Sequence, residues 1–183
     1  MNKKYLIPAA LLGVALAAGA IPLKADLAHS SVAAVFKQMN VPVEAKFKKF
    51  SAQVDYDAAR PENGKASVDI DTASLDLGDA EMNKEVAKKD WFNSAQFPKA
   101  TFTSSSIKPN GAGKLTVAGK LAIKGKTLDV SFPLSVKAEG GKQVFEGSLP
   151  IKRLAFNIGE GEWKDTSMVA DDVVIKFRVT AAQ

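Results

Sequence analysis

Apolar and polar residues alternate along most of the chain after residue 30, and this alternation predicts β-strands. Leu128, Val130 and Phe132, for example, alternate with Asp129 and other polar residues. Successive side chains of a strand point to opposite faces, so such a segment has one buried and one solvated side, which is typical of antiparallel sheets. The pattern predicts eight strands, over residues 31–38, 47–57, 66–74, 100–107, 114–124, 127–138, 142–153 and 172–181.

The connections between the predicted strands contain turn-forming residues, including Gly64, Gly111, Gly125 and Gly140. Glycine adopts the positive φ angles of tight turns, so these connections are predicted to be hairpin-like. Pro133 and Pro150 interrupt their strands and are predicted at edge or bulge positions. An antiparallel meander of this kind closes readily into a barrel, which removes exposed edges. The sequence therefore predicts an all-β fold built on an eight-stranded antiparallel barrel.

One short helix interrupts the β pattern after the third predicted strand. Asp79 is a suitable N-cap, Glu81 lies at the positive end of the helix dipole, and Lys88 lies near the negative end. Met82 and Val86 are four residues apart and form a narrow apolar stripe. We expect this helix to lie on the barrel or across its mouth.

The residue types that the chain lacks exclude several classes of enzyme. The 183 residues, a length that usually forms one domain, include no Cys and a single His. Disulfides, thiolate metal sites, a cysteine nucleophile and any site with two imidazoles are therefore excluded. The chain also lacks the Gly-x-Ser-x-Gly motif of α/β-hydrolases. We predict a protein that is not an enzyme, with no catalytic residue, no metal site and no cofactor.

The N-terminal segment has the features of a secretory signal peptide. Lys3 and Lys4 form a basic start, residues 6–20 are uncharged and rich in Ala and Leu, and Ala18-Gly19-Ala20 is a small-x-small cleavage pattern. Cleavage after Ala25 is an alternative.

The same uncharged run is long enough to suggest a second hypothesis, a retained membrane anchor. We favour the signal peptide because of the small-residue cleavage pattern. The signal peptide is accordingly predicted over residues 1–20, the folded domain over residues 26–183, and the mature protein in the periplasm.

The positive charge of the chain does not indicate a nucleic-acid partner. The formal net charge of +5 falls to +3 when the two lysines of the signal peptide are removed. Only Arg60, Arg153 and Arg178 are arginines, and they are far apart in the sequence, whereas base readout favours arginine. We interpret the lysines as a solvated surface, with transient contact to anionic lipid head groups as a further expectation.

Several segments, taken in order, resemble one protein family. They are residues 67–75 (SVDIDTASL), 90–93 (DWFN), 97–104 (FPKATFTS), 117–127 (VAGKLAIKGKT) and 151–156 (IKRLAF). Together they resemble the YceI-like, polyisoprenoid-binding family of exported bacterial proteins, and the resemblance extends over residues 26–183.

The resemblance implies an extended, lipocalin-like barrel with a long apolar cavity for a polyisoprenoid or another amphiphile, such as a polyprenyl phosphate or a quinone tail. The residues alone favour a core filled by inward aromatic side chains over a cavity, and the resemblance reverses this preference. The candidate lining residues are Phe36, Met39, Phe47, Phe50, Val68, Ile70, Met82, Val86, Phe92, Phe102, Leu121, Ile123, Phe132, Leu134 and Phe156.

Two polar residues are candidates for contact with the head group of such a ligand. Ser104 belongs to a hydroxyl-rich strand, and its alternative interpretation is an exposed β-strand face. Arg153 shares strand parity with Leu149 and Ile151, which makes it a candidate for an inward direction, whereas the usual exposure of arginine favours a bulge that returns it to solvent.

The leading hypothesis is therefore a periplasmic protein that binds, sequesters or transports a long-chain lipid without catalysis. The alternatives are a ligand-free accessory barrel that binds a partner in a stress response, and a small hydrolase with an acidic site that the sequence does not reveal. The sequence also leaves open whether the barrel forms a homodimer.

Overall fold

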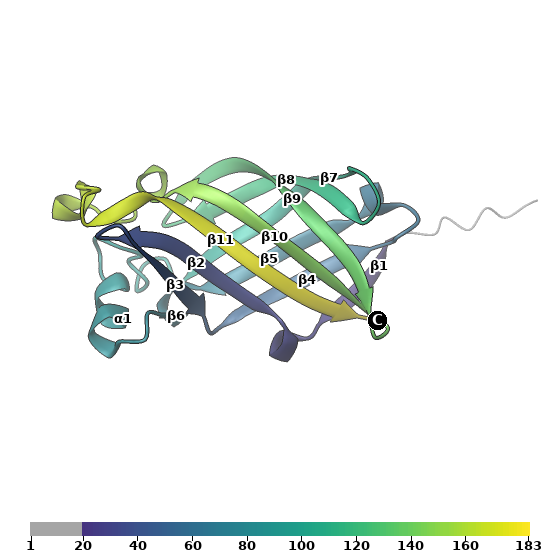
Figure 1. Ribbon diagram of the computed structural model, residues 1–183, viewed down its shortest axis with the longest axis horizontal. Helices are drawn as coiled ribbons and strands as arrows, with labels where there is room; N and C mark the ends of the chain where they lie inside the picture. Colours follow the sequence, from purple (N-terminus) through teal and green to yellow (C-terminus); the bar gives the residue numbers. More distant parts are fainter. Residues whose placement is uncertain (1–19) are drawn as a thin grey trace, which may run out of the picture.

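A single antiparallel sheet closes into a barrel in the computed structural model, which describes residues 20–183 (Figure 1). Residues 1–19, and with them nearly all of the predicted signal peptide, lie outside the described residues. The strands are β1 (Ile21–Ala25), β2 (Ser31–Gln38), β3 (Val41–Phe47), β4 (Phe50–Tyr56), β5 (Lys65–Asp71), β6 (Leu75–Asp76), β7 (Lys99–Pro109), β8 (Lys114–Ile123), β9 (Lys126–Glu139), β10 (Lys142–Lys152) and β11 (Val169–Ala182).

Eight long strands form the wall of the barrel, because three of them are interrupted. β1 continues into β2 after the short 3-10 turn η1 (Leu27–His29), β3 into β4 after two residues, and β5 into β6 through η3 (Thr72–Ser74). β4 and β11 both pair with β1, and β2 pairs with β11 and β3, so the sheet closes on itself. This confirms the predicted eight-stranded antiparallel barrel.

Three strand segments were not predicted, namely β1, the first part of β3 and the two-residue β6. β1 precedes residue 26, where the folded domain was expected to begin, and its residues pair with Gln53–Tyr56 of β4. The first part of β3 follows a two-residue hairpin at Met39 and Asn40, whose φ angles are 46° and 64°. Positive φ at both central residues is the geometry of a type I′ hairpin, which the sequence marks here with only one favourable residue, Asn40.

The two prolines lie where neighbouring strands separate, in agreement with the predicted edge positions. β9 and β10 pair only between Leu134–Glu139 and Lys142–Gly147. Pro133 of β9 and Pro150 of β10 lie beyond this ladder. Pro133 pairs only with β8 and Pro150 only with β11, so β9 and β10 do not pair with each other at either proline. A missing N–H is tolerated at such positions.

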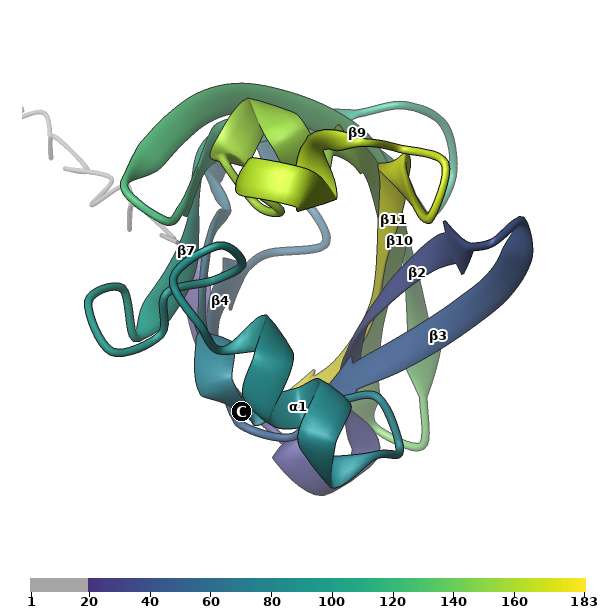
Figure 2. The same ribbon diagram turned by 90° about the vertical axis from the view of Figure 1, so that its left-hand side faces the viewer.

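The predicted helix is present as α1 (Ala80–Val86), after the third long strand. The Asp79 carboxylate accepts hydrogen bonds of 2.9 Å from the backbone N–H groups of Glu81 and Met82, which confirms the N-cap. α1 lies at one end of the barrel, across from the segment that holds η4 (Arg153–Phe156) and η5 (Gly161–Lys164) (Figure 2). η2 (Pro61–Asn63) follows β4. No helix among residues 20–183 is both long and apolar enough to cross a membrane.

Arg153 organises the η4–η5 segment from a buried position, with only 2% of its surface exposed. Its guanidinium donates hydrogen bonds to the backbone carbonyls of Ile158 (2.8 Å), Trp163 (2.7 Å), Val169 (2.8 Å) and Ala170 (3.1 Å), with a longer contact of 3.4 Å to the carbonyl of residue 159. Carbonyls of an irregular segment need such donors when they are buried. One side chain thus supplies the donors that strand pairing supplies elsewhere.

We predict that Arg153→Lys strongly destabilises the protein. Lysine keeps the charge but cannot reach several carbonyls with one ammonium group, and each buried carbonyl left unpaired costs about 1–3 kcal/mol. Urea unfolding should give a free energy of unfolding lower by at least about 3 kcal/mol. A change within about 0.5 kcal/mol, the range of ordinary surface substitutions, would contradict the role given to Arg153.

At the opposite end of the barrel, Asp26 joins the β1–β2 junction to β10. Its carboxylate accepts hydrogen bonds from Lys142 Nζ at 2.7 Å and from His29 Nδ1 at 2.9 Å. These contacts, with Lys142 the stronger, lower the pKa of Asp26 from 3.8 to about 2. The backbone N–H of Asp26 also donates to the Thr180 carbonyl of β11 at 2.7 Å.

We predict that Asp26 stabilises the barrel in a pH-dependent way. Because its pKa is lower in the folded state, its contribution is fully present above about pH 4 and disappears as the pH falls through about 2. Asp26→Asn should therefore lower the melting temperature at pH 7, and the difference in melting temperature from the wild type should shrink as the pH is lowered to 2. Equal effects at pH 7 and pH 2, measured by thermal circular dichroism, would show that the charge is unimportant.

Candidate functional site

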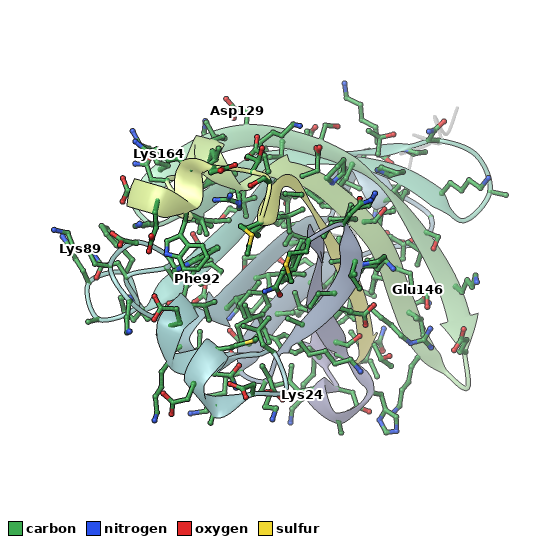
Figure 3. All side chains as sticks on the ribbon, turned by 60° about the vertical axis from the view of Figure 1, so that its left-hand side comes forward. Lys24, Lys89, Phe92, Asp129, Glu146 and Lys164 are labelled. Carbon is green, nitrogen blue, oxygen red and sulfur yellow. The ribbon has the colours of Figure 1, made fainter. Side chains whose placement is uncertain are left out.

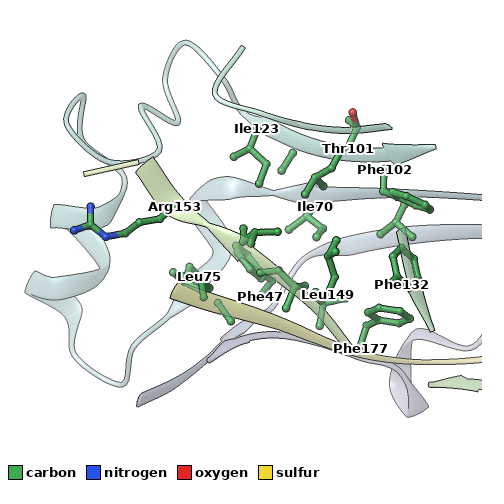
Figure 4. A pocket seen from close by; sticks show the side chains of 18 of the residues that line it. Phe47, Ile70, Leu75, Thr101, Phe102, Ile123, Phe132, Leu149, Arg153 and Phe177 are labelled. Atoms are coloured by element: carbon green, nitrogen blue, oxygen red, sulfur yellow. The ribbon is translucent and has the colours of Figure 1, made fainter. Parts of the chain in front are cut away.

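The interior of the barrel is a long cavity of about 350 Å³ with an almost entirely apolar wall. Figure 4 shows apolar side chains projecting into it along its length, with Arg153 at one end. Many inward side chains stay only half-buried although they point away from solvent; these are Phe36, Val68, Ile70, Phe102, Leu134, Ile151, Ile175 and Phe177. A filled core would bury them fully, so the barrel is hollow.

Most of the predicted lining residues do line this cavity. They are Phe36, Phe47, Val68, Ile70, Met82, Val86, Phe92, Phe102, Leu121, Ile123, Phe132 and Leu134. Strand parity places the residues of the wall, and the apolar stripe of α1 places Met82 and Val86 at one end of the cavity. Figure 3 shows Phe92 directed toward the interior, whereas Lys89, Asp129 and Lys164 project outward.

Three predicted lining residues lie elsewhere. Met39 is 62% exposed, because the β2–β3 hairpin directs it into solvent. Phe50 stands at the start of β4, just after the break from β3, and packs beside Phe47 and Leu75 without lining the cavity. Phe156 is 1% exposed and belongs to η4, which leaves the strand pattern and carries this ring into the core beside the wall.

Neither candidate head-group residue is placed to bind a ligand in the cavity, because Ser104 does not line it and the donors of Arg153 are occupied. Ser104 lies at a β-bulge of β7, and its hydroxyl oxygen accepts a hydrogen bond of 2.9 Å from the backbone N–H of Ala66, away from the cavity lining. Arg153 lines the cavity and is not returned to solvent by a bulge, but its N–H groups are directed at the carbonyls of its own segment. Burial lowers the pKa of Arg153.

Sequence reasoning missed several lining residues. Val117 and Leu149 share strand parity with predicted residues, and Val179 lies on the apolar face of β11, so all three could have been found from the alternation. Tyr56 could have been found in the same way from Val54 on β4. Trp163 follows no periodic pattern, because η5 is an irregular segment, and no signal in the sequence marks it.

Polar groups of the cavity wall lie mainly at its two ends. At the α1 end, the rings of Trp91 and Trp163 are 5.2 Å apart, and Arg153 Cζ lies 5.5 Å from the centre of the Trp91 ring. Trp91 Nε1 is buried and has no hydrogen-bond partner among residues 20–183. Glu85, also at this end, is paired with Lys88 at 2.6 Å.

At the other end, Tyr56 and Phe145 meet edge to face, with ring centres 5.3 Å apart. Burial raises the pKa of Tyr56, and the charge of Asp57 adds to this effect. Between the two ends, the wall offers apolar side chains to whatever occupies the cavity. Residues 20–183 contain no cluster of three or more metal-ligating side chains. The arrangement can therefore hold an apolar chain along its axis and a polar group at an end.

Curated relatives of the chain are bacterial proteins of similar size. A UPF0312 protein of Shewanella putrefaciens strain CN-32 is 35% identical over 155 residues, which cover 81% of this chain and 77% of that protein. A UPF0312 protein of Shewanella baltica strain OS155 is 32% identical over 145 residues, which cover 75% of each chain.

Solved structures share the barrel. BcnA of Burkholderia cenocepacia aligns with a TM-score of 0.85 and 57% identity, over 87% of this chain and 100% of BcnA. A YceI protein of Campylobacter jejuni aligns with a TM-score of 0.72 and 25% identity, over 77% of this chain and 85% of that protein. A polyisoprenoid-binding domain of Saccharophagus degradans has the same fold, with a TM-score of 0.70 at 16% identity, over 89% of this chain and 98% of that domain.

The family model of the YceI-like domain matches residues 23–181, from within β1 almost to the end of β11. The sequence match thus covers nearly the whole closed barrel and the segments that frame its hollow apolar interior. This chain belongs to the YceI-like domain family.

Proposed function

We propose that the protein binds one long-chain amphiphile, such as a polyprenyl phosphate or the isoprenoid tail of a quinone, inside the barrel and without catalysis. The observation that carries this proposal is the hollow interior, whose inward apolar side chains are left half-buried around about 350 Å³ of space. A volume of about 300–1,000 Å³ is typical of ligand pockets. An apolar chain along the axis would cover those side chains.

The energy of burying such a chain is sufficient for tight binding. Each methylene transferred from water to an apolar site contributes about 0.8 kcal/mol. A chain of more than about twenty carbons therefore exceeds the cost of association and ordering, which is about 4–15 kcal/mol. Affinity of this origin depends on the length and width of the ligand, so the apolar wall suits a family of related chains.

The polar head is assigned to the α1 end in this proposal. Arg153, Trp91 and Glu85 gather there, and Met82, which lines the cavity, is 47% exposed at the same end. A polar group there can remain near water while the chain enters the apolar interior. The related fold of the Saccharophagus degradans polyisoprenoid-binding domain supports the choice of an isoprenoid chain.

We predict that filling the cavity removes binding. Ile70→Trp places a large ring in the lumen, whereas Ser51→Trp adds the same ring to the exposed face of the neighbouring strand and serves as the control. Delipidated protein should bind geranylgeraniol in a fluorescence displacement assay. Ile70→Trp should weaken this binding at least tenfold, which corresponds to the lost burial of about two methylenes, and Ser51→Trp should not.

Mass spectrometry of organic extracts from freshly purified protein gives a second readout. A co-purified amphiphile, depleted in Ile70→Trp, is the expected result. If the wild-type protein carries no amphiphile and takes up no added prenol, the proposed function is wrong.

We also propose that the protein is exported and that its signal peptide is cleaved after Ala20. The pairing of β1 supports this site, because cleavage after Ala25 would remove Ile21–Ala25 and leave the edge of β4 that does not face β5 unpaired. Periplasmic extracts of a bacterium expressing the full chain should contain a form that begins at Ile21, as read by intact mass. A form that begins at Asp26, or an uncleaved chain in the cytoplasm, would contradict the proposal.

A further inference from the structure

Three phenylalanines form a continuous band on one half of the inner wall. Phe102 of β7, Phe132 of β9 and Phe177 of β11 lie on alternate strands, and both neighbouring pairs have ring centres 5.4 Å apart. We call these three residues the aromatic collar. Figure 4 shows the collar at the end of the view away from Arg153. The middle ring, Phe132, is only 6% exposed, so the band is closely packed.

A glycine lies under each outer ring, on the strand between two collar residues. A Cβ atom at Gly147 of β10 would lie 2.5 Å from Cζ of Phe177, and one at Gly119 of β8 would lie 2.7 Å from Cε2 of Phe102. Real Cβ atoms essentially never approach other atoms so closely. Neither glycine has a positive φ angle. Their role is therefore to leave room for the rings to lie against the wall, out of the lumen.

The opposite half of the wall carries small side chains at the same level. Val68 pairs with Phe102, Ala52 pairs with Val68, and Val32 pairs with Phe177. All three small residues line the cavity. The width of the lumen at this level is thus set by how far the collar rings stand out from the wall.

The collar separates two parts of the cavity. Val169, at the α1 end of the cavity, precedes Phe177 by eight positions on β11. For a strand tilted by about 40°, the distance between these two residues along the barrel axis is about 20 Å. Beyond the collar, a shorter part is lined by Ile107 and Leu115 and ends at Tyr56 and Phe145. A chain that enters at the α1 end must pass the collar to use this inner part.

We propose that the aromatic collar, held flat by Gly119 and Gly147, determines the length of chain that the cavity accepts. This inference rests on the proposed binding of a long apolar chain. With the rings against the wall, the end of a long chain passes into the inner part of the cavity. With a ring pushed into the lumen, the outer part still binds a short chain, but a longer chain gains nothing from its additional carbons.

Gly147→Ala is the most direct test. The closest contact of a Cβ at Gly147 is the tip of the Phe177 ring, which can turn into the lumen, and the backbone oxygen of Pro133 lies at 3.0 Å. A Cβ at Gly119 would lie closer still to the backbone oxygen of Thr103, which is a harder collision. The double variant Gly147→Ala/Phe177→Leu removes the ring that the new methyl group displaces, and it serves as the matched control for folding defects. Farnesol and geranylgeraniol, which differ by one isoprene unit, are the probes, and their dissociation constants are measured by calorimetry.

Wild-type protein should bind geranylgeraniol at least tenfold more tightly than farnesol, because each added buried methylene contributes about fourfold. Gly147→Ala should bind farnesol as the wild type does and lose the preference for geranylgeraniol. Gly147→Ala/Phe177→Leu should recover it.

Two results would overturn the role of the collar. The first is that Gly147→Ala weakens the binding of both prenols equally or leaves the wild-type preference for geranylgeraniol intact. The second is that the double variant folds and binds farnesol but does not recover this preference. Failure of the proposed function gives a different result, since wild-type protein would then bind neither prenol.

Discussion

Closure of the sheet through β1 and β11 is the contact on which the rest of the structure depends. Lys24 and Ala25 pair with the end of β11, while the preceding residues of β1 pair with β4. Eight strands closed in this way leave a lumen that side chains can just fill or that can hold one small ligand. In this barrel the inward side chains stay half-buried, so closure produces a cavity, and the irregular segments gather at its ends.

Charge is kept out of the middle of this lumen by the alternation of the strands. Lys120 and Asp129 pair on the outer face at 2.9 Å, and Lys99 and Asp69 pair there at 3.0 Å. Among residues 20–183, Arg153 has the only fully buried guanidinium, and its N–H groups donate hydrogen bonds to backbone carbonyls. A wall without free charge along its middle cannot select a ligand by ion pairing, so in the proposed function a ligand is selected by its length and width.

The regular part of the barrel could be predicted from the sequence because a period of two fixes which side chains face inward. The prediction failed where that period stops. β1 cannot be distinguished in the sequence from the uncharged signal segment that precedes it. Met39 points outward because it lies in a hairpin turn with positive φ angles, and Phe156 lies in a 3-10 turn outside the regular strand. Strand parity made Arg153 a candidate for an inward direction, but the carbonyls that it binds belong to an irregular segment that no periodicity describes.

The central claim is that the barrel interior is hollow and apolar, and diffraction from crystals under xenon pressure tests it most directly. Xenon enters apolar cavities that water leaves empty. A hollow apolar interior should hold ordered xenon atoms along the barrel axis, in contact with Ile70, Leu121 and Phe132. An interior with no xenon, in which the rings of Phe102 and Phe177 meet the opposite wall and fill the lumen, would contradict it.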